Sequence, residues 1–260
     1  MSRTVLPSSR AEVYVFELTG QFKSDPDAGV PVQVRADRVS LQGPHGTLLP
    51  PTSLTVQAGD LALVHGEPGV GVTAFGLALA GRLKPSTGTV TVNHAADATG
   101  DLRKIVAVVD APGVSEPDGA LTLRVVVGEE LALAHRPAAK ADAERWLSEH
   151  DAAAFASTRF ENLEPALRTR LLTALAAGRE GVRVLVLDTP DRHTSDVGSW
   201  ARIAREHAER GLAVVVLTAT TPESALPHPP ARIGSADQPE PQRCSPGPET
   251  AELSAEGDQA

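Results

Sequence analysis

The sequence predicts an α/β protein built on a parallel sheet, with a helical insertion near the middle of the chain. Short apolar segments that fit buried strands alternate with helical segments, which is typical of parallel sheets covered by helices. A glycine-rich loop, Gly66–Thr73 (GEPGVGVT), follows one such strand and precedes a helix. This order points a helix N-terminus at an anion.

The elements follow in chain order. Residues 31–60 contain two expected strands separated by a turn over Gly43–Pro51, and Leu61–Val64 is the short apolar strand before the glycine-rich loop. The other expected strands are Thr87–Val92, Ile105–Val109, Val182–Leu187 and Leu212–Thr218. The expected helices are Ala74–Gly81, Val125–His135, Ala138–His150, Leu167–Ala177 and Ser199–Arg210.

The chain divides into three parts. Residues 1–30 form an N-terminal extension in which Glu12–Leu18 alternates as an edge strand would. Residues 31–225 form the α/β domain, with the helical subdomain at about 121–178. Residues 226–260 are rich in Pro, Glu and Ser, which predicts a disordered tail.

Composition excludes several classes of protein. The net charge of -9 over 260 residues argues against a nucleic-acid surface driven by general electrostatics. The single cysteine, Cys244, excludes a disulfide framework or cysteine-based zinc site and is interpreted as an incidental exposed thiol. No apolar stretch approaches the roughly 20 residues that span a bilayer, and the first residues do not look like a signal peptide. A cytoplasmic location is expected.

The loop has the spacing of a phosphate-binding motif with one substitution. Two glycines stand five positions apart, and Thr73 supplies the hydroxyl of the pattern, but Val72 stands where the pattern has lysine. In this motif backbone N–H groups surround the phosphates, the lysine neutralises them and the hydroxyl binds Mg²⁺. The candidate nucleotide-binding residues are Gly66, Gly69, Gly71, Val72, Thr73 and Ala74. The alternative is a tight βα turn without a ligand.

Several segments together resemble the ATP-binding subunit of an ABC transporter, over residues 31–225. Ser53–Asn93 is similar to the opening stretch of that family, Leu121–Ala134 to the start of its helical subdomain, and Val182–Asp196 to its Walker B strand and the loop after it. The resemblance implies a P-loop NTPase fold with an ABC-ATPase-like core, a mixed or parallel sheet and an inserted helical subdomain.

The resemblance also implies cofactors and partners. ATP and Mg²⁺ would bind at the loop, with Thr73 and Asp188 as the metal ligands. The partners would be a membrane permease and a second ATP-binding subunit, in a homodimer or heterodimer, and no nucleic acid. The chain would then lie in the cytoplasm or peripherally on the inner face of the membrane.

Each catalytic position departs from the family pattern. Val72 replaces the lysine, Thr189 replaces the carboxylate that activates water, and Thr220 replaces the switch histidine. A threonine hydroxyl is a poor general base near neutral pH. The glutamine after the strand that ends at Val109 corresponds to Asp110, and the adenine-stacking aromatic falls near Leu41. No catalytic residue is therefore assigned.

The family signature LSGGQ is replaced as well. Glu164 would place a negative charge where a serine hydroxyl stands, and Pro165 has no N–H to offer. The signature-like residues are Leu163, Glu164, Pro165, Ala166 and Leu167.

Three hypotheses follow. The first is a degenerate ABC-type ATP-binding protein, a regulatory or structural subunit with weak or no ATP hydrolysis. The second is a non-enzymatic scaffold that keeps the fold without nucleotide. The third is an ATPase that uses other cations, for which the candidates are Arg82, Lys84, Arg103 and Lys104, although solvated surface charge is the simpler interpretation.

Other polar residues suggest little. His65 is expected to pack at a strand end, and Asp191 and Asp196 are expected to be solvated loop carboxylates, of which Asp196 matches a family residue that contacts the partner subunit. The isolated histidines have no metal-site spacing; they are His94, His135, His150 and His193.

Overall fold

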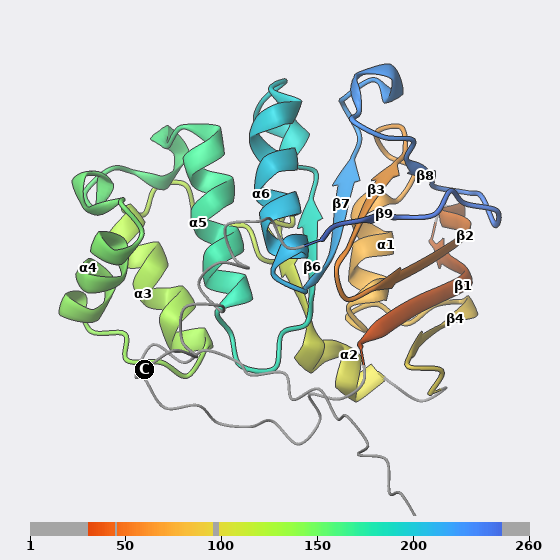
Figure 1. Cartoon of the computed structure of the whole chain (residues 1–260), viewed down its shortest axis with the longest axis horizontal. Helices are drawn as coiled ribbons and strands as arrows, with labels where there is room; N and C mark the ends of the chain where they lie inside the picture. The colour runs from red at the N-terminus through yellow and green to blue at the C-terminus, as the bar shows by residue number, and fades with distance from the viewer. Residues whose placement is uncertain (1–30, 45, 96–98, 246–260) are drawn as a thin grey trace, which may run out of the picture.

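The computed structural model describes residues 31–44, 46–95 and 99–245, which form two sheets and a group of helices (Figure 1). The expected extension 1–30, with its Glu12–Leu18 strand, lies outside these residues. Figure 1 shows the antiparallel sheet at one end, the parallel sheet in the centre and the helices of residues 123–177, which we call the helical group, at the other end.

The antiparallel sheet has the order β2-β1-β4. Its strands are β1 (Gln33–Gly43), β2 (Gly46–Gln57) and β4 (Thr87–Val92). β1 and β2 pair antiparallel as far as Gly43 and Gly46, so the turn between them is shorter than the expected Gly43–Pro51.

The central sheet has the order β5-β6-β7-β3-β8, and all of these neighbours are parallel. Its strands are β3 (Asp60–His65), β5 (Val106–Val109), β6 (Val184–Asp188), β7 (Ala213–Thr218) and β8 (Ala231–Arg232), and β9 (Gln242–Arg243) pairs antiparallel with β3. The main strands are almost entirely apolar because both faces of the sheet are covered.

Alternate residues of the sheet enter two separate cores. On one face, Ala62 and Val64 pack with α1 (Val72–Leu79), which lies between the two sheets. On the other face, Leu61 and Leu63 pack with α6 (Val197–Glu209) and the helical group. The parallel sheet is therefore packed on both faces, and the loop follows the carboxyl end of β3.

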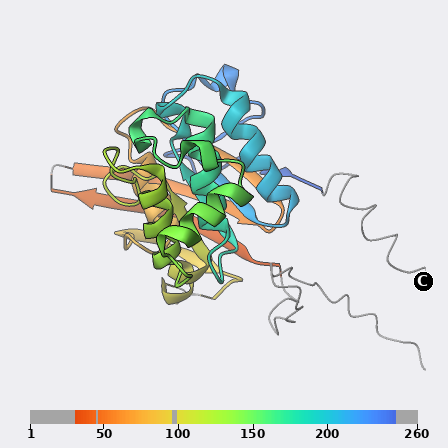
Figure 2. The ribbon, with the colours of Figure 1, turned by 90° about the vertical axis from the view of Figure 1, so that its left-hand side faces the viewer.

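Three helices follow β5 and precede β6, as the sequence predicted. They are α3 (Leu123–Leu133), α4 (Lys140–Glu149) and α5 (Pro165–Ala177), with short 3₁₀ turns η1 (Ala153–Phe155) and η2 (Phe160–Asn162) between α4 and α5. In Figure 2, which faces this end of the molecule, the three helices lie in front of the sheet. No helix in the described ranges is both long and apolar enough to cross a membrane.

Two short segments differ from the sequence prediction. Helix α2 (Thr99–Ile105) was not expected. Only Leu102 of its seven residues is buried, so the segment has no apolar stripe from which a helix could be predicted. The expected tail 226–260 is ordered over its first part, since β8 and β9 pair with β3. Prolines do not prevent this, because each strand contributes only two residues to the edge of the sheet.

Cys244 is another correction. Its side chain is buried, not exposed, and its N–H donates to the Gly59 carbonyl oxygen at 2.9 Å. Burial raises the pKa of the thiol. The sequence suggested exposure because Cys244 lies in a Pro-rich segment, but β9 pairs with β3 and brings this segment against the sheet.

Candidate functional site

The glycine-rich loop joins β3 to α1 and presents free backbone donors. Gly69 and Gly71 have φ values of 88° and 91°, in the left-handed region that favours glycine. Gly71 is the N-cap of α1 and has no side chain that could cap the helix. Within the described residues, the N–H groups of Val72, Thr73 and Ala74 have no acceptor. A helix N-terminus with unpaired donors is a favourable place for an anion.

Val72 belongs to the core rather than to the surface of the loop. The residue is only 5 % exposed. A Cβ built on Gly66 would lie 3.0 Å from Val72 Cγ2 and 2.8 Å from Ile233 Cγ1, so these side chains pack closely against the start of the loop. The residue at the lysine position therefore contributes packing and no charge.

The two expected metal ligands meet at the end of β6. The Thr73 hydroxyl donates to Asp188 Oδ1 at 3.1 Å, and Asp188 is buried. The other carboxylate oxygen, Oδ2, is buried without a hydrogen-bond partner. Burial raises the pKa of Asp188, although the Thr73 hydrogen bond and the Arg192 charge oppose this. A hydroxyl and an unsatisfied carboxylate oxygen are ligands that suit Mg²⁺.

Thr189, at the position of the expected water-activating carboxylate, adopts a left-handed conformation with φ 45°. Its hydroxyl lies 3.3 Å from Arg192 Nη1, and the same nitrogen donates to the Asp188 carbonyl oxygen at 2.9 Å. The Arg192 guanidinium thus contacts the last residue of β6 and the residue that follows it.

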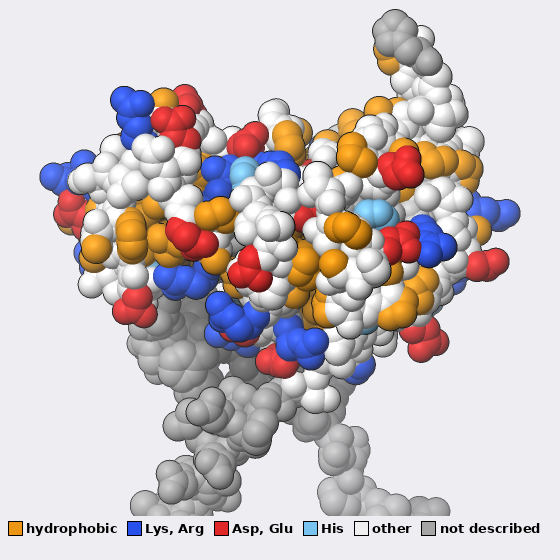
Figure 3. Space-filling model, turned by 90° about the horizontal axis from the view of Figure 1, so that it is seen from above, with side chains coloured by type: hydrophobic (Ala, Val, Ile, Leu, Met, Phe, Trp, Pro, Cys, Tyr) orange, Lys and Arg blue, Asp and Glu red, His pale blue; other side chains and the backbone are white. Residues whose placement is uncertain are grey.

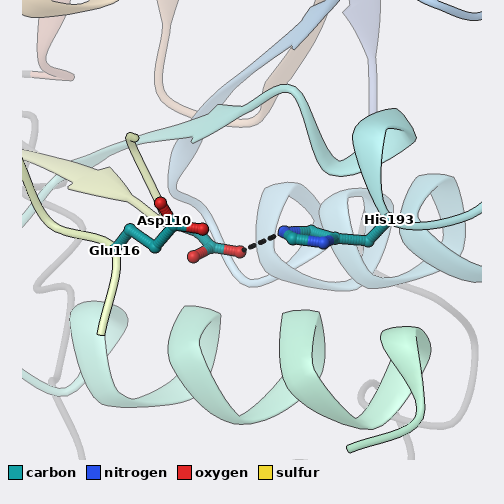
Figure 4. A group of neighbouring side chains, drawn as sticks. All are labelled: Asp110, Glu116 and His193. Atoms are coloured by element: carbon teal, nitrogen blue, oxygen red, sulfur yellow. Dashed lines mark hydrogen bonds and ion pairs between the residues drawn. The ribbon is translucent and has the colours of Figure 1, made fainter. Parts of the chain in front are cut away.

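Five charged or titratable side chains converge beside the ends of β5 and β6. Arg168 of α5 donates twice to Asp110, at 2.9 and 2.6 Å, and once to Glu116. Arg192 lies 3.0 Å from Glu116 and 3.3 Å from Asp110. His193 Nε2 lies 3.1 Å from Asp110 Oδ2, and Figure 4 shows the imidazole facing this carboxylate, with Glu116 beside it. We call these five residues the ionic cluster.

Electrostatics in the ionic cluster favour the ionised form of Asp110. Burial opposes ionisation, but the hydrogen bonds from His193 and Arg168 and the charges of Arg168 and Arg192 outweigh it, so the pKa of Asp110 is lowered. The Arg168 guanidinium also lies 4.4 Å from the centre of the Phe160 ring. The cluster therefore joins the helical group to the sheet through a buried, charge-assisted contact.

The signature-like segment forms the start of α5, where Glu164 is the N-cap. Its carboxylate accepts hydrogen bonds from the N–H groups of Ala166 and Leu167, at 3.0 and 2.9 Å, and Pro165 occupies the first helical position. Leu163 is buried. The donors that this helix could offer to a phosphate are thus taken by a carboxylate of the same chain.

Asp191 forms hydrogen bonds with Thr220, the residue at the expected switch position. Asp191 Oδ2 accepts the N–H groups of Ala219, Thr220 and Thr221 at 2.7 to 2.9 Å, and the Thr220 hydroxyl donates to the Asp191 carbonyl oxygen. Asp191 is 6 % exposed. The expectation of a solvated carboxylate is therefore wrong, because three backbone donors converge on Oδ2, while Oδ1 is buried without a hydrogen-bond partner.

Other residues that the sequence suggested for nucleotide binding lie away from the loop or are buried. Leu41 is buried in the core, so it offers no surface to an adenine ring. Arg103 donates to the Gly81 carbonyl oxygen, beyond the C-terminal end of α1. An eight-residue helix is about 12 Å long, and it separates that carbonyl from the loop. His65 ends β3 as expected, with Nδ1 3.2 Å from the Thr218 hydroxyl.

Charges of both signs are scattered over the face toward which β6 and β7 point. Figure 3, seen from above, shows acidic, basic and histidine side chains interspersed with hydrophobic ones. No single sign dominates this view. A ligand at the loop would therefore be held by local donors rather than by a broad positive field.

Solved structures with the same arrangement are ATP-binding cassettes. The chain matches the ATP-binding subunit of an ABC transporter with 18 % identity and a TM-score of 0.52, over 72 % of this chain and 79 % of that chain. It matches the dimeric ATP-binding cassette MJ0796, in a post-hydrolysis state bound to ADP and Pi, with 18 % identity and a TM-score of 0.56, over 71 % and 87 %. This is the fold of an ABC-type ATP-binding subunit.

A third match is the bacterial Atm1-family ABC exporter with ATP bound, with 16 % identity and a TM-score of 0.53. It covers 73 % of this chain but only 35 % of the exporter. No protein-family model matches the sequence, and no curated protein matches it significantly. The predicted ABC-ATPase-like fold, with its helical insertion, is confirmed.

Sequence reasoning missed the ionic cluster. Arg168 and His193 lie 58 and 83 positions from Asp110, so no local spacing connects them. The sequence pattern indicates Asp110 only as the counterpart of a family glutamine, and His193 only as an isolated histidine. These residues come together only because β5 and β6 are neighbouring parallel strands, whose carboxyl ends lie side by side.

Proposed function

We propose that this chain is an ABC-type ATP-binding protein that binds Mg·ATP weakly and hydrolyses it little or not at all. It acts as a regulatory or structural subunit beside a membrane permease and a second ATP-binding subunit. The observation that carries the proposal is the loop itself. Its free N–H groups and the Thr73–Asp188 pair remain, whereas the lysine position holds a buried valine.

Binding of the phosphates is supported by the retained groups. The unpaired N–H groups of Val72, Thr73 and Ala74 stand at the N-terminus of α1, where the helix dipole favours an anion. Thr73 and Asp188 would hold Mg²⁺, which supplies positive charge to the phosphates when it is bound. Weak affinity follows from the absence of a lysine charge at Val72.

Slow hydrolysis is supported by the replaced groups. Phosphoryl transfer depends on positioning and on electrostatic stabilisation of a highly charged transition state. The hydroxyl of Thr189 is no general base, and loss of a general base costs about 10²- to 10⁴-fold in rate. Thr220 is held by Asp191 through its N–H and hydroxyl. Both replacements, Thr189 and Thr220, would slow the same step, phosphoryl transfer to water. The slow hydrolysis therefore cannot be assigned to one of them alone.

The role as a non-motor subunit is supported by α5. An intact partner would need free donors at this helix N-terminus to complete a site that the two chains share. Glu164 accepts two of these donors, and Pro165 has no N–H. Pairing with this chain would therefore leave such a shared site incomplete.

The experiment is calorimetric titration of the purified chain with ATP, in Mg²⁺ and in EDTA, beside a phosphate-release assay. We expect Mg²⁺-dependent binding and release no faster than the background. Val72→Lys should strengthen binding but leave turnover at background, because Thr189 and Thr220 are unchanged. Turnover restored by this single change would refute the proposal. Complete absence of ATP binding would instead favour the non-enzymatic scaffold.

A further inference from the structure

We infer that Arg192 supplies the positive charge that Val72 cannot, by contacting the phosphates of the nucleotide held at the loop. When no nucleotide is bound, the same guanidinium forms an ion pair with Glu116. The inference rests on the proposed function, because it names a binding residue of that site and an internal competitor.

The position of Arg192 supports this role. Its Nη1 contacts the Asp188 carbonyl oxygen at 2.9 Å and the Thr189 hydroxyl at 3.3 Å. The carboxylate of Asp188 in turn lies 3.1 Å from the Thr73 hydroxyl, on the first turn of α1. The guanidinium is thus linked through one residue to the loop that presents the free N–H groups.

Two other arginines, Arg168 and Arg103, are already bound elsewhere. Arg168 has a side chain that is 8 % exposed, makes two hydrogen bonds to Asp110 and lies over Phe160. Arg103 is bound beyond the far end of α1. Arg192 has a side chain that is 20 % exposed. It contacts β6 through one nitrogen, Nη1, and the acidic side chains through the other, Nη2.

Glu116 is the partner of Arg192 that is most easily displaced. Its side chain is 35 % exposed, against 9 % for Asp110, and it lies on the Pro- and Gly-containing segment between β5 and α3. A part-exposed ion pair contributes little free energy, so exchanging this carboxylate for a phosphate costs little. Arginine binds carboxylate and phosphate with the same planar pair of donors, which allows the exchange.

The ionic cluster favours an anion over a metal ion as the added ligand. Asp110, Glu116 and His193 each offer an atom within 4.8 Å of the others, which alone would suit a cation. However, Arg168 and Arg192 already balance the two carboxylates. A cation would have to displace both arginines, whereas an anion needs only to displace Glu116.

The test measures Mg·ATP affinity by calorimetry on the full chain and four variants. Arg192→Gln should weaken binding by roughly ten- to a hundredfold, which is the value of a charge-assisted hydrogen bond. Arg192→Lys should recover part of the loss. Glu116→Gln should strengthen binding by about two- to fivefold, because the competitor is removed. Arg202→Gln, on the exposed face of α6, is the matched control and should leave affinity unchanged.

A double-mutant cycle separates this role from a structural one. In the Arg192→Gln background, Glu116→Gln should have no effect on affinity, since the group that it frees is missing. Unchanged or weaker binding in Glu116→Gln alone would overturn the inference, even if Arg192→Gln did not fold. If the natural chain binds Mg·ATP and no Arg192 or Glu116 variant alters its affinity, only the inference fails. If neither the natural chain nor Glu116→Gln binds Mg·ATP, the proposed function fails as well.

Discussion

Replacing Asp191 should test how the segment at the switch position is held. In Asp191→Ala, the N–H groups of Ala219, Thr220 and Thr221 lose a shared carboxylate acceptor. A hydrogen bond to a charged group contributes about 1.5–3 kcal/mol. Only the Thr221 bond is fully buried, so water can replace part of the other two. We therefore expect the free energy of unfolding to fall by about 3–4 kcal/mol.

The assay is equilibrium unfolding in guanidinium chloride, with the midpoint and slope compared between variants. Asp191→Asn keeps one acceptor oxygen of similar shape and should lose about 1–2 kcal/mol. Asp196→Ala is the matched control, because this exposed carboxylate lies in the same loop and accepts no hydrogen bond within the described residues. It should stay within about 0.5 kcal/mol of the natural chain. If Asp191→Ala were as stable as Asp196→Ala, the three short contacts would not be holding this segment.

Three further predictions concern titration and capping. Burial lowers the pKa of His207 to about 4, so the unfolded chain binds this proton first and stability is lost as pH falls from 6.5 toward 4. The loss is about 3 kcal/mol at most, and His207→Gln should flatten this part of the curve of melting temperature against pH. The pKa of Asp188 is raised, so its ionised form weakens the fold as pH rises above 3.8. Asp188→Asn should therefore raise the melting temperature at pH 7 without Mg²⁺ and abolish any Mg²⁺-dependent rise. A lower melting temperature at pH 7 would contradict this. Glu164→Ala removes the N-cap of α5 and should cost about 1 kcal/mol in guanidinium unfolding, whereas Glu161→Ala, in an exposed ion pair, should be nearly neutral.

Local patterns were sufficient to predict the α/β class and the main strands of the parallel sheet. The near-continuous apolar runs at β3, β5, β6 and β7 predict strands buried on both faces, and the structure has them there within two residues. The segment between β5 and β6 has helical spacing and forms α3–α5. These predictions succeed because a strand that is buried on both faces needs an apolar side chain at almost every position.

Order in the segment after residue 225 could not be predicted in the same way. β8 and β9 have only two residues each, and the residues around them are polar or proline. Their stability comes from pairing with β3, which lies more than 160 positions earlier in the chain. The same pairing buries Cys244, which composition alone marked as exposed.

The sequence by itself determined the α/β class, the glycine-rich loop and the valine at position 72 of that loop, and the family resemblance named Thr73 and Asp188 as a pair. Each of these depends on spacing within one element or on a motif whose geometry is the same in many proteins. Only the tertiary structure decided which side chains surround these positions. Glu164 fills its own helix N-terminus, and Arg192 reaches the end of β6 while pairing with Glu116. Contacts such as the pair of Arg192 with Glu116 join side chains far apart in sequence, because parallel strands bring their carboxyl ends to one edge of the sheet.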